Sequence, residues 1–125
     1  MDRHSNSKPV VLILEDEVLI GINLQDEFQE AGYRVAEPFT TCADALEWLR
    51  TSTPDVAVLD AALKDGSCRE IARELEKRAV PFLIYSGYGE NQGLMAEFRH
   101  SPWLEKPIPP SELVQACQQL LGTHA

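Results

Sequence analysis

The sequence predicts an α/β fold in which helices cover both faces of a parallel sheet. Apolar, strand-like runs alternate along the chain with amphipathic stretches, the order that is typical of β-α-β units. The runs at 10–14 and 56–59 are unbroken, as expected of parallel strands that are buried on both faces. With 125 residues, the chain is long enough for one domain of this kind and short for two.

Five short runs along the chain have the character of strands and are bounded by residues that turn or end them. They are expected at 10–15, 33–37, 55–59, 81–85 and 103–105. Pro38 is expected to close the second strand, and Asp60 directly follows the third. The carboxyl ends of these strands are therefore well defined by the sequence.

The first three expected helices have recognisable ends. The first, over about 17–31, repeats apolar residues four positions apart and ends at Gly32. The next two begin at capping boxes, in which a Ser or Thr is followed three residues later by an acid. The boxes are Thr41 with Asp44 and Ser67 with Glu70. The Thr53-Pro54 pair breaks the second helix, because the residue before proline avoids the helical region.

Buried faces are expected on the later helices. The third is expected to bury Ile71, Leu75 and Ala79. A short fourth helix between 90 and 101 would be anchored by Leu94 and Phe98. The last covers about 111–121, with Gly122 as its C-cap. Four or five helices therefore accompany the five strands.

Composition excludes several kinds of partner. The formal net charge of −9 disfavours nucleic acids and anionic membrane surfaces, because both would repel the protein. No apolar run approaches the roughly 20 residues that are needed to span a bilayer. The three cysteines are far apart and odd in number, which favours a reducing cytoplasm. They are Cys42, Cys68 and Cys117.

The N-terminus differs from the rest of the chain. Residues 1–8 are polar and lack the apolar segment of a signal peptide, so we expect a disordered tail there. Residues 9–123 are expected to form the single folded domain. Within these 125 residues we expect no second, effector domain.

Three carboxylates follow the ends of buried strands. Glu15 is the last residue of the first expected strand and Asp16 follows it, and Asp60 directly follows the third strand. Ligands of open α/β sheets bind outside the carboxyl ends of the strands, and a group of acids there suits Mg²⁺. An acid pair at a helix start is also explained by the helix dipole alone. Asp60 has no helix to cap in the local sequence, which favours a functional role for this acid.

Three further residues are expected at the same edge. Lys106 follows the last strand and can hold a phosphoryl group as a point charge. Pro107 allows a cis peptide bond between Lys106 and Pro107. Ser86 offers a hydroxyl where the fourth strand ends. Each of these alone is also explained as an ordinary loop residue. Together they describe Asp60 as a carboxylate that accepts a phosphoryl group, helped by a metal and a lysine.

With these residues in order, the chain resembles the receiver domain of two-component response regulators. The resemblance implies a flavodoxin-like, doubly wound sheet of five parallel strands in the order 2-1-3-4-5. It also implies Asp60 as phosphoacceptor, Ser86 and Lys106 as its partners, and phosphoryl transfer from a phosphohistidine on a histidine kinase or phosphotransfer protein. The implied Mg²⁺ ligands are Asp16, Asp60, the carbonyl of Ala62 and, largely through water, Glu15.

Residues 81–89 are similar to a Pro-Phe-x-Phe-Ala-Thr-Gly-Tyr-Gly stretch of a receiver subgroup, many of whose members are stand-alone. Ile84, Tyr85 and Ser86 replace Phe, Ala and Thr of that stretch. Trp103 stands where most receivers have the Tyr or Phe of a rotameric switch, and an indole is too bulky to swing easily. We therefore expect phosphorylation to order residues 88–101 instead. The switch or output candidates are Gly87, Tyr88, Trp103 and Pro107.

Other classes of protein fit less well. An aspartyl-phosphate phosphatase of the haloacid dehalogenase type expects a second Asp at Ala62, and a nucleotide- or flavin-binding domain expects glycines after the first strand. A degenerate receiver that acts as a phosphorylation-independent adaptor stays open. So does the choice among phosphate shuttle, phosphate sink and phosphorylation-dependent adaptor, with an unknown downstream target. We expect self-catalysed phosphotransfer and dephosphorylation, without turnover of small molecules.

Overall fold

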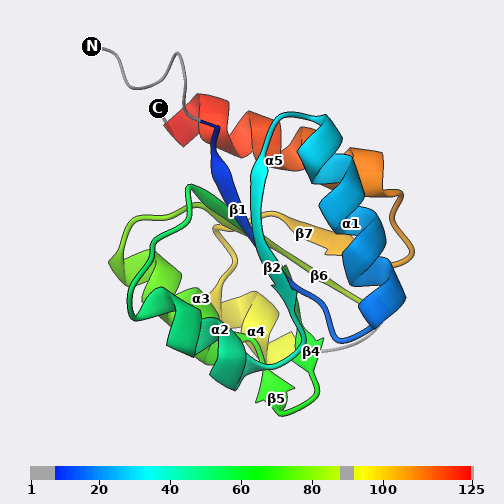
Figure 1. The fold of residues 1–125 in the computed structure, drawn as a ribbon. Helices are drawn as coiled ribbons and strands as arrows, with labels where there is room; N and C mark the ends of the chain where they lie inside the picture. The colour runs from blue at the N-terminus through cyan, green and yellow to red at the C-terminus, as the bar shows by residue number, and fades with distance from the viewer. Residues whose placement is uncertain (1–7, 88–91, 125) are drawn as a thin grey trace.

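A parallel sheet of five strands forms the centre of the protein (Figure 1). The computed structural model describes residues 8–87 and 92–124. The strands, in sheet order, are β2 (Arg34–Phe39), β1 (Val10–Leu14), β3 (Val56–Asp60), β6 (Phe82–Ser86) and β7 (Trp103–Glu105). All four neighbouring pairs are parallel. The doubly wound order 2-1-3-4-5 is confirmed, with β6 and β7 as the fourth and fifth strands of this sheet.

Helices cover both faces of this sheet. They are α1 (Val18–Glu30), α2 (Cys42–Leu49), α3 (Arg69–Lys77), α4 (Gln92–Glu97) and α5 (Pro110–His124). Figure 1 shows α1 and α5 on one face and α2, α3 and α4 on the other. None of the described helices combines the length and the apolar character that crossing a bilayer requires.

Two cores lie above and below the sheet because successive strand residues point to opposite faces. In β1, Val11 and Ile13 belong to the core under α1 and α5, whereas Leu12 and Leu14 belong to the other core. Tyr85 of β6 lies in the core under α1 and α5. Side chains at the carboxyl ends of the strands are therefore held by rigid, buried elements.

The expected end of the second strand at Pro38 is wrong, because β2 continues through Pro38 to Phe39. Among the described strands, β2 pairs with β1 alone, so it is an edge strand, where a missing N–H group costs little. The register between the two strands shifts between Leu12 and Leu14. A Cβ on Gly21 of α1 would lie 3.0 Å from Pro38 Cβ, so this glycine permits close packing of the helix on the edge strand.

The start of α3 differs from the expectation. Ser67 is not its N-cap, because Ser67 belongs to β5 (Gly66–Ser67), which pairs with β4 (Ala62–Leu63) in an antiparallel hairpin. The helix begins at Arg69, whose N–H group donates to Ser67 Oγ at 3.3 Å. Ala79, expected to be buried, is exposed and lies beyond the helix with a φ of 58°. Ile71 and Leu75 are buried as predicted.

The remaining helix ends are partly as expected. Asp44 N–H donates to Thr41 Oγ1 at 3.1 Å, so Thr41 caps α2 as predicted. The helix ends at Leu49, well before Pro54, and α5 continues through Gly122 to His124 rather than ending there. The tail expected over residues 1–8 lies, apart from Lys8, outside the described residues.

Candidate functional site

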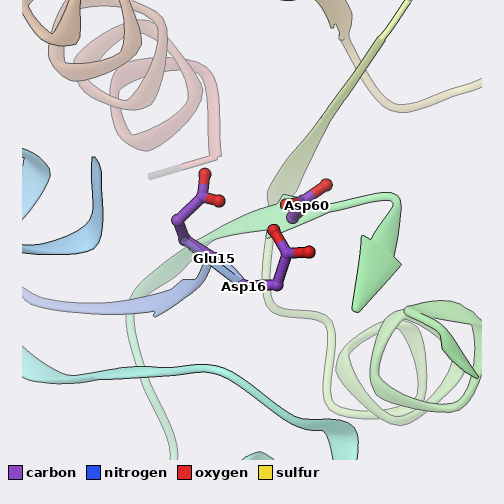
Figure 2. Close-up of side chains that lie close together, drawn as sticks. All are labelled: Glu15, Asp16 and Asp60. Carbon is purple, nitrogen blue, oxygen red and sulfur yellow. The ribbon is translucent and has the colours of Figure 1, made fainter. Parts of the chain in front are cut away.

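Three acids meet at the carboxyl edge of the sheet. Glu15 and Asp16 follow β1, Asp60 ends β3, and the two strands are neighbours with Leu14 paired to Leu59. Each acid offers one carboxylate oxygen within 4.8 Å of the others (Figure 2). Glu15 is fully buried and Asp60 is 2% exposed. The predicted convergence of these carboxylates is therefore present in the structure.

The acid cluster fits a divalent cation. Three carboxylate oxygens this close repel one another, and hard oxygen ligands are those that Mg²⁺ prefers. Burial, together with the negative charge of Glu15, raises the pKa of Asp60 to about 7, against the hydrogen bond and the positive charge of Lys106. A bound cation would relieve the repulsion and favour the ionised acids.

Glu15 has protein donors on both carboxylate oxygens. Its Oε2 accepts the N–H of Glu17 at 2.9 Å, and its Oε1 accepts the hydroxyl of Tyr85. Burial, together with the nearby charge of Glu15, raises the pKa of Tyr85 far above its ordinary value, so the hydroxyl keeps its proton and donates. The orientation of Glu15 is thus fixed from two sides.

Lys106 reaches the acids from the loop after β7. Its Nζ lies 3.0 Å from Asp60 Oδ2 and 3.8 Å from Glu15 Oε1. Burial alone would lower its pKa, but the hydrogen bond to Asp60 and the surrounding acids raise it, so the side chain stays an ammonium. The peptide bond between Lys106 and Pro107 is cis, as the sequence allowed.

Backbone contacts hold the remaining predicted residues at the same edge. Ser86 ends β6, is 7% exposed, and accepts the N–H of Lys106 on its carbonyl at 2.8 Å. Ala62 opens β4, and its N–H group donates to Asp60 Oδ1 at 3.2 Å. Gly87 follows Ser86 directly, whereas Tyr88 lies outside the described residues. The structure therefore brings the predicted acids and Lys106 together, and backbone contacts place Ser86 and Ala62 next to them at this edge.

Trp103 lies away from the acid cluster. It packs against the core under α2, α3 and α4, and its indole N–H donates to the carbonyl of Phe98 at 3.1 Å. Phe98 follows α4 directly and is buried, with its ring 6.0 Å from that of Phe82. Trp103 thus ties the short strand β7 to the end of α4.

Sequence reasoning gave no role to two residues that shape the site. Tyr85 was noted only as a departure from a family pattern, yet it pairs with Asp60 in the sheet register. Asp65, in the turn of the β4–β5 hairpin, accepts the N–H groups of Cys42 and Ala43 at 2.8 and 3.1 Å. Asp65 therefore caps α2 from more than 20 residues away, and no local sequence signal marks it.

Comparison with known proteins agrees with this geometry. The profile of the family described as "Response regulator receiver domain" matches residues 11–118. The chain is 33% identical over 118 residues to the KDP operon transcriptional regulatory protein KdpE of Escherichia coli, covering 92% of the chain and 52% of KdpE. It is 24% identical over 114 residues to the chemotaxis protein CheY of Thermotoga maritima, covering 88% of the chain and 95% of CheY.

Solved structures share the fold. A response regulator receiver protein from Sinorhizobium medicae aligns with a TM-score of 0.83 at 23% identity, covering 95% of this chain and 98% of that one. SdrG from Sphingomonas melonis aligns with a TM-score of 0.75 at 30% identity, covering 91% and 97%.

These likenesses place the chain among two-component signalling proteins. The chain belongs to the response regulator receiver domain family. It spans about half the length of KdpE, at 52%, and of the PdtaR proteins of Mycobacterium tuberculosis that it also matches, at 54%. Receiver domains are signalling domains, and they interact with histidine kinases or phosphotransfer proteins.

Proposed function

We propose that Asp60 accepts a phosphoryl group from a phosphohistidine in a Mg²⁺-dependent reaction. The observation that carries the proposal is the environment of Asp60. Its Oδ2 lies 3.0 Å from the ammonium of Lys106, and its carboxylate stands within the cluster formed with Glu15 and Asp16. A carboxylate between a cation and a metal-binding pair is suited to phosphoryl transfer, which depends on positioning and electrostatics.

The step forms one bond and breaks another. A carboxylate oxygen of Asp60 attacks phosphorus, the P–N bond of the phosphohistidine breaks, and the imidazole nitrogen takes the electron pair and then a proton. The product on the protein is an acyl phosphate. In the later dephosphorylation, water attacks phosphorus and the Asp60 carboxylate leaves, which releases inorganic phosphate.

Asp16, Asp60 and the carbonyl of Ala62 would hold the cation, with Glu15 acting largely through water. When bound, Mg²⁺ supplies positive charge against the oxygens of the transferring group. Lys106 keeps its ammonium beside the attacking oxygen and can follow the phosphoryl group once it is attached. Ser86, at the same edge, offers a hydroxyl to a phosphoryl oxygen.

The surface of α1 supports docking of a protein that carries the phosphohistidine. Among the described residues, the exposed large hydrophobic side chains are Val18, Leu19 and Ile22, all on α1. Val18 and Leu19 follow Glu17 at the start of the helix, next to the acid cluster. An apolar patch beside a reactive edge fits a protein partner better than a small molecule.

The three buried, free thiols agree with the expected cytoplasmic location.

The output segment would be residues 88–101, of which 92–101 are described. Two ion pairs join the end of α4 to α3: Glu97 accepts Arg69 Nε at 2.6 Å and Arg73 Nε at 2.7 Å. These contacts, with the bond from Trp103 to Phe98, hold the described part of the segment that we expect phosphorylation to order further. The partial likeness to the stand-alone subgroup supports signalling through protein contacts or phosphate relay. Which of the two operates depends on the downstream target.

Labelling by acetyl phosphate tests the proposal. Wild-type protein with Mg²⁺ is expected to gain one phosphoryl group by intact-mass spectrometry, and chelation of Mg²⁺ should abolish the gain. Asp60→Asn should remain unlabelled, whereas Asp26→Asn, a matched change at an exposed acid of α1, should label normally. Labelling of Asp60→Asn at another residue would reject the assignment.

A further inference from the structure

We propose that Tyr85 is a positioning residue of the acid site, which fixes Glu15 through its hydroxyl and Lys106 through its ring. The inference rests on the proposed phosphoacceptor function, because Glu15 and Lys106 matter to chemistry only if Asp60 is phosphorylated. Tyr85 itself neither binds metal nor takes part in the transfer. Its contribution is to hold two groups that do.

The backbone places Tyr85 for this role. Tyr85 lies on β6 directly opposite Asp60 of β3 in the parallel register, one residue before Ser86. It is 2% exposed, on the face of the sheet that α1 and α5 cover. Tyr85 also lines an open pocket, together with Leu24 and Leu113. The side chain is therefore rigidly held between the apolar core and the acids.

The hydroxyl acts on Glu15. Glu15 is fully buried, with Tyr85 donating to Oε1 and the N–H of Glu17 donating to Oε2. A buried carboxylate with a donor on each oxygen is held in one orientation. Outer-shell donors of this kind set how well a ligand meets its metal. Removing the hydroxyl leaves Glu15 held on one side only.

The ring acts on Lys106. The Nζ of Lys106 lies 4.9 Å from the centroid of the Tyr85 ring, within the range of a cation–π contact. The same atom lies 3.0 Å from Asp60 Oδ2. A lysine side chain is long and flexible, so an aromatic surface beneath it restricts the positions of the ammonium. Tyr85 thus links the two charged groups that flank Asp60.

Two substitutions separate the two contacts. Tyr85→Phe removes only the hydroxyl, so the dissociation constant for Mg²⁺ should rise about tenfold. The maximal rate of labelling by acetyl phosphate at saturating Mg²⁺ should stay at the wild-type level. Tyr85→Leu also removes the ring, so its maximal rate should fall about threefold. Calorimetric titration with Mg²⁺ alone and intact-mass kinetics measure the two quantities.

Matched variants keep the result interpretable. Tyr33→Phe removes the hydroxyl of another buried tyrosine in the same core, 4% exposed, and should leave Mg²⁺ affinity unchanged. Thermal unfolding in a chelator compares the stability of both Phe variants without metal. Asp16→Asn should lose most Mg²⁺ binding, which reports on the proposed function separately.

The outcomes distinguish the two ideas. Wild-type Mg²⁺ affinity in Tyr85→Phe, with weak binding by Asp16→Asn, would overturn the role of Tyr85 and leave the proposed function standing. A loss of maximal rate in Tyr85→Phe with unchanged affinity would also overturn it. Failure of the wild-type protein to bind Mg²⁺ would overturn both. Weaker binding in Tyr85→Phe alone among the two Phe variants would support the inference.

Discussion

Lys106 Nζ lies 3.0 Å from Asp60 Oδ2, and Asp60 is almost completely buried. The two residues come from the loop after β7 and the end of β3, which are 46 positions apart in the chain. Removing one partner of such a pair leaves the other charge poorly compensated. The stability of this edge of the sheet therefore depends on whether Asp60 is ionised.

Lys106→Ala should spare Mg²⁺ binding, because the lysine supplies no metal ligand, but impair the response to phosphorylation. We expect acetyl phosphate to alter amide hydrogen exchange in residues 92–101 of the wild-type protein and not in this variant. Lys77→Ala, a change at an exposed lysine of α3, is the matched control and should respond like the wild type. A normal exchange response in Lys106→Ala would contradict the role given to this lysine.

Asp60→Asn should stabilise the metal-free protein at high pH. Burial raises the pKa of Asp60 from 3.8 to about 7, so between these values the folded state holds a proton that the unfolded state has released. The contribution of Asp60 to stability therefore falls as the pH rises through this window. The Asn variant avoids that loss and should gain about 2 kcal/mol at pH 8, allowing for solvent screening and the unpaired Lys106.

Chemical denaturation in a chelator measures this gain at several pH values. The advantage of the Asn variant should shrink steadily as the pH is lowered from 8 towards 4. An advantage that is independent of pH would mean that Asp60 titrates at its ordinary pKa in the folded protein.

Trp103→Phe should loosen the end of α4. The change keeps an aromatic ring in the core but removes the indole N–H that donates to the carbonyl of Phe98. A single hydrogen bond of this kind contributes about 1 kcal/mol. Faster amide exchange in residues 92–101 is the expected result, measured by mass spectrometry. Trp48→Phe, at a partly buried position on α2, serves as control, and equal effects of both changes would argue against a specific tie.

Asp65→Ala should destabilise the protein and weaken Mg²⁺ binding. The Asp65 carboxylate accepts two backbone N–H groups at the start of α2, and the hydrogen bond from Cys42 holds its pKa below the ordinary value. Without these bonds the hairpin that begins at Ala62 is held less firmly to α2, although the Cys42 thiol still donates to the carbonyl of Ser67 at 2.9 Å. Thermal unfolding and calorimetric titration with Mg²⁺ measure the two effects. Unchanged metal affinity would show that the hairpin needs no such anchor.

The acid edge could be predicted because its signal is local. Glu15 and Asp60 interrupt apolar runs, and parallel strands bring their carboxyl ends to one side of the sheet. The brief strand Trp103–Glu105 was also predicted with its observed bounds. These features depend on residues next to one another in the chain, which periodicity and turn chemistry describe well.

The contacts that complete the site depend on residues far apart in sequence. Tyr85 meets Glu15 across 70 positions, and Asp65 meets Cys42 across 23. The β4–β5 hairpin has strands of two residues, too short to carry a period. Ser67 belongs to this hairpin and not to the start of α3, so the capping box predicted at Ser67 and Glu70 was wrong. Tertiary packing, rather than local propensity, decides such features.

The proline inside β2 has a consequence for intermolecular strand pairing. An exposed edge strand offers free N–H and C=O groups to other chains, and this is a common route to aggregation. Pro38 places a residue without an N–H group in this edge strand, and the exposed charge of Glu37 precedes it. At the opposite margin, β7 has only three residues. Both edges of the sheet are thus poor templates for a strand of another chain. This disfavours aggregation through strand pairing.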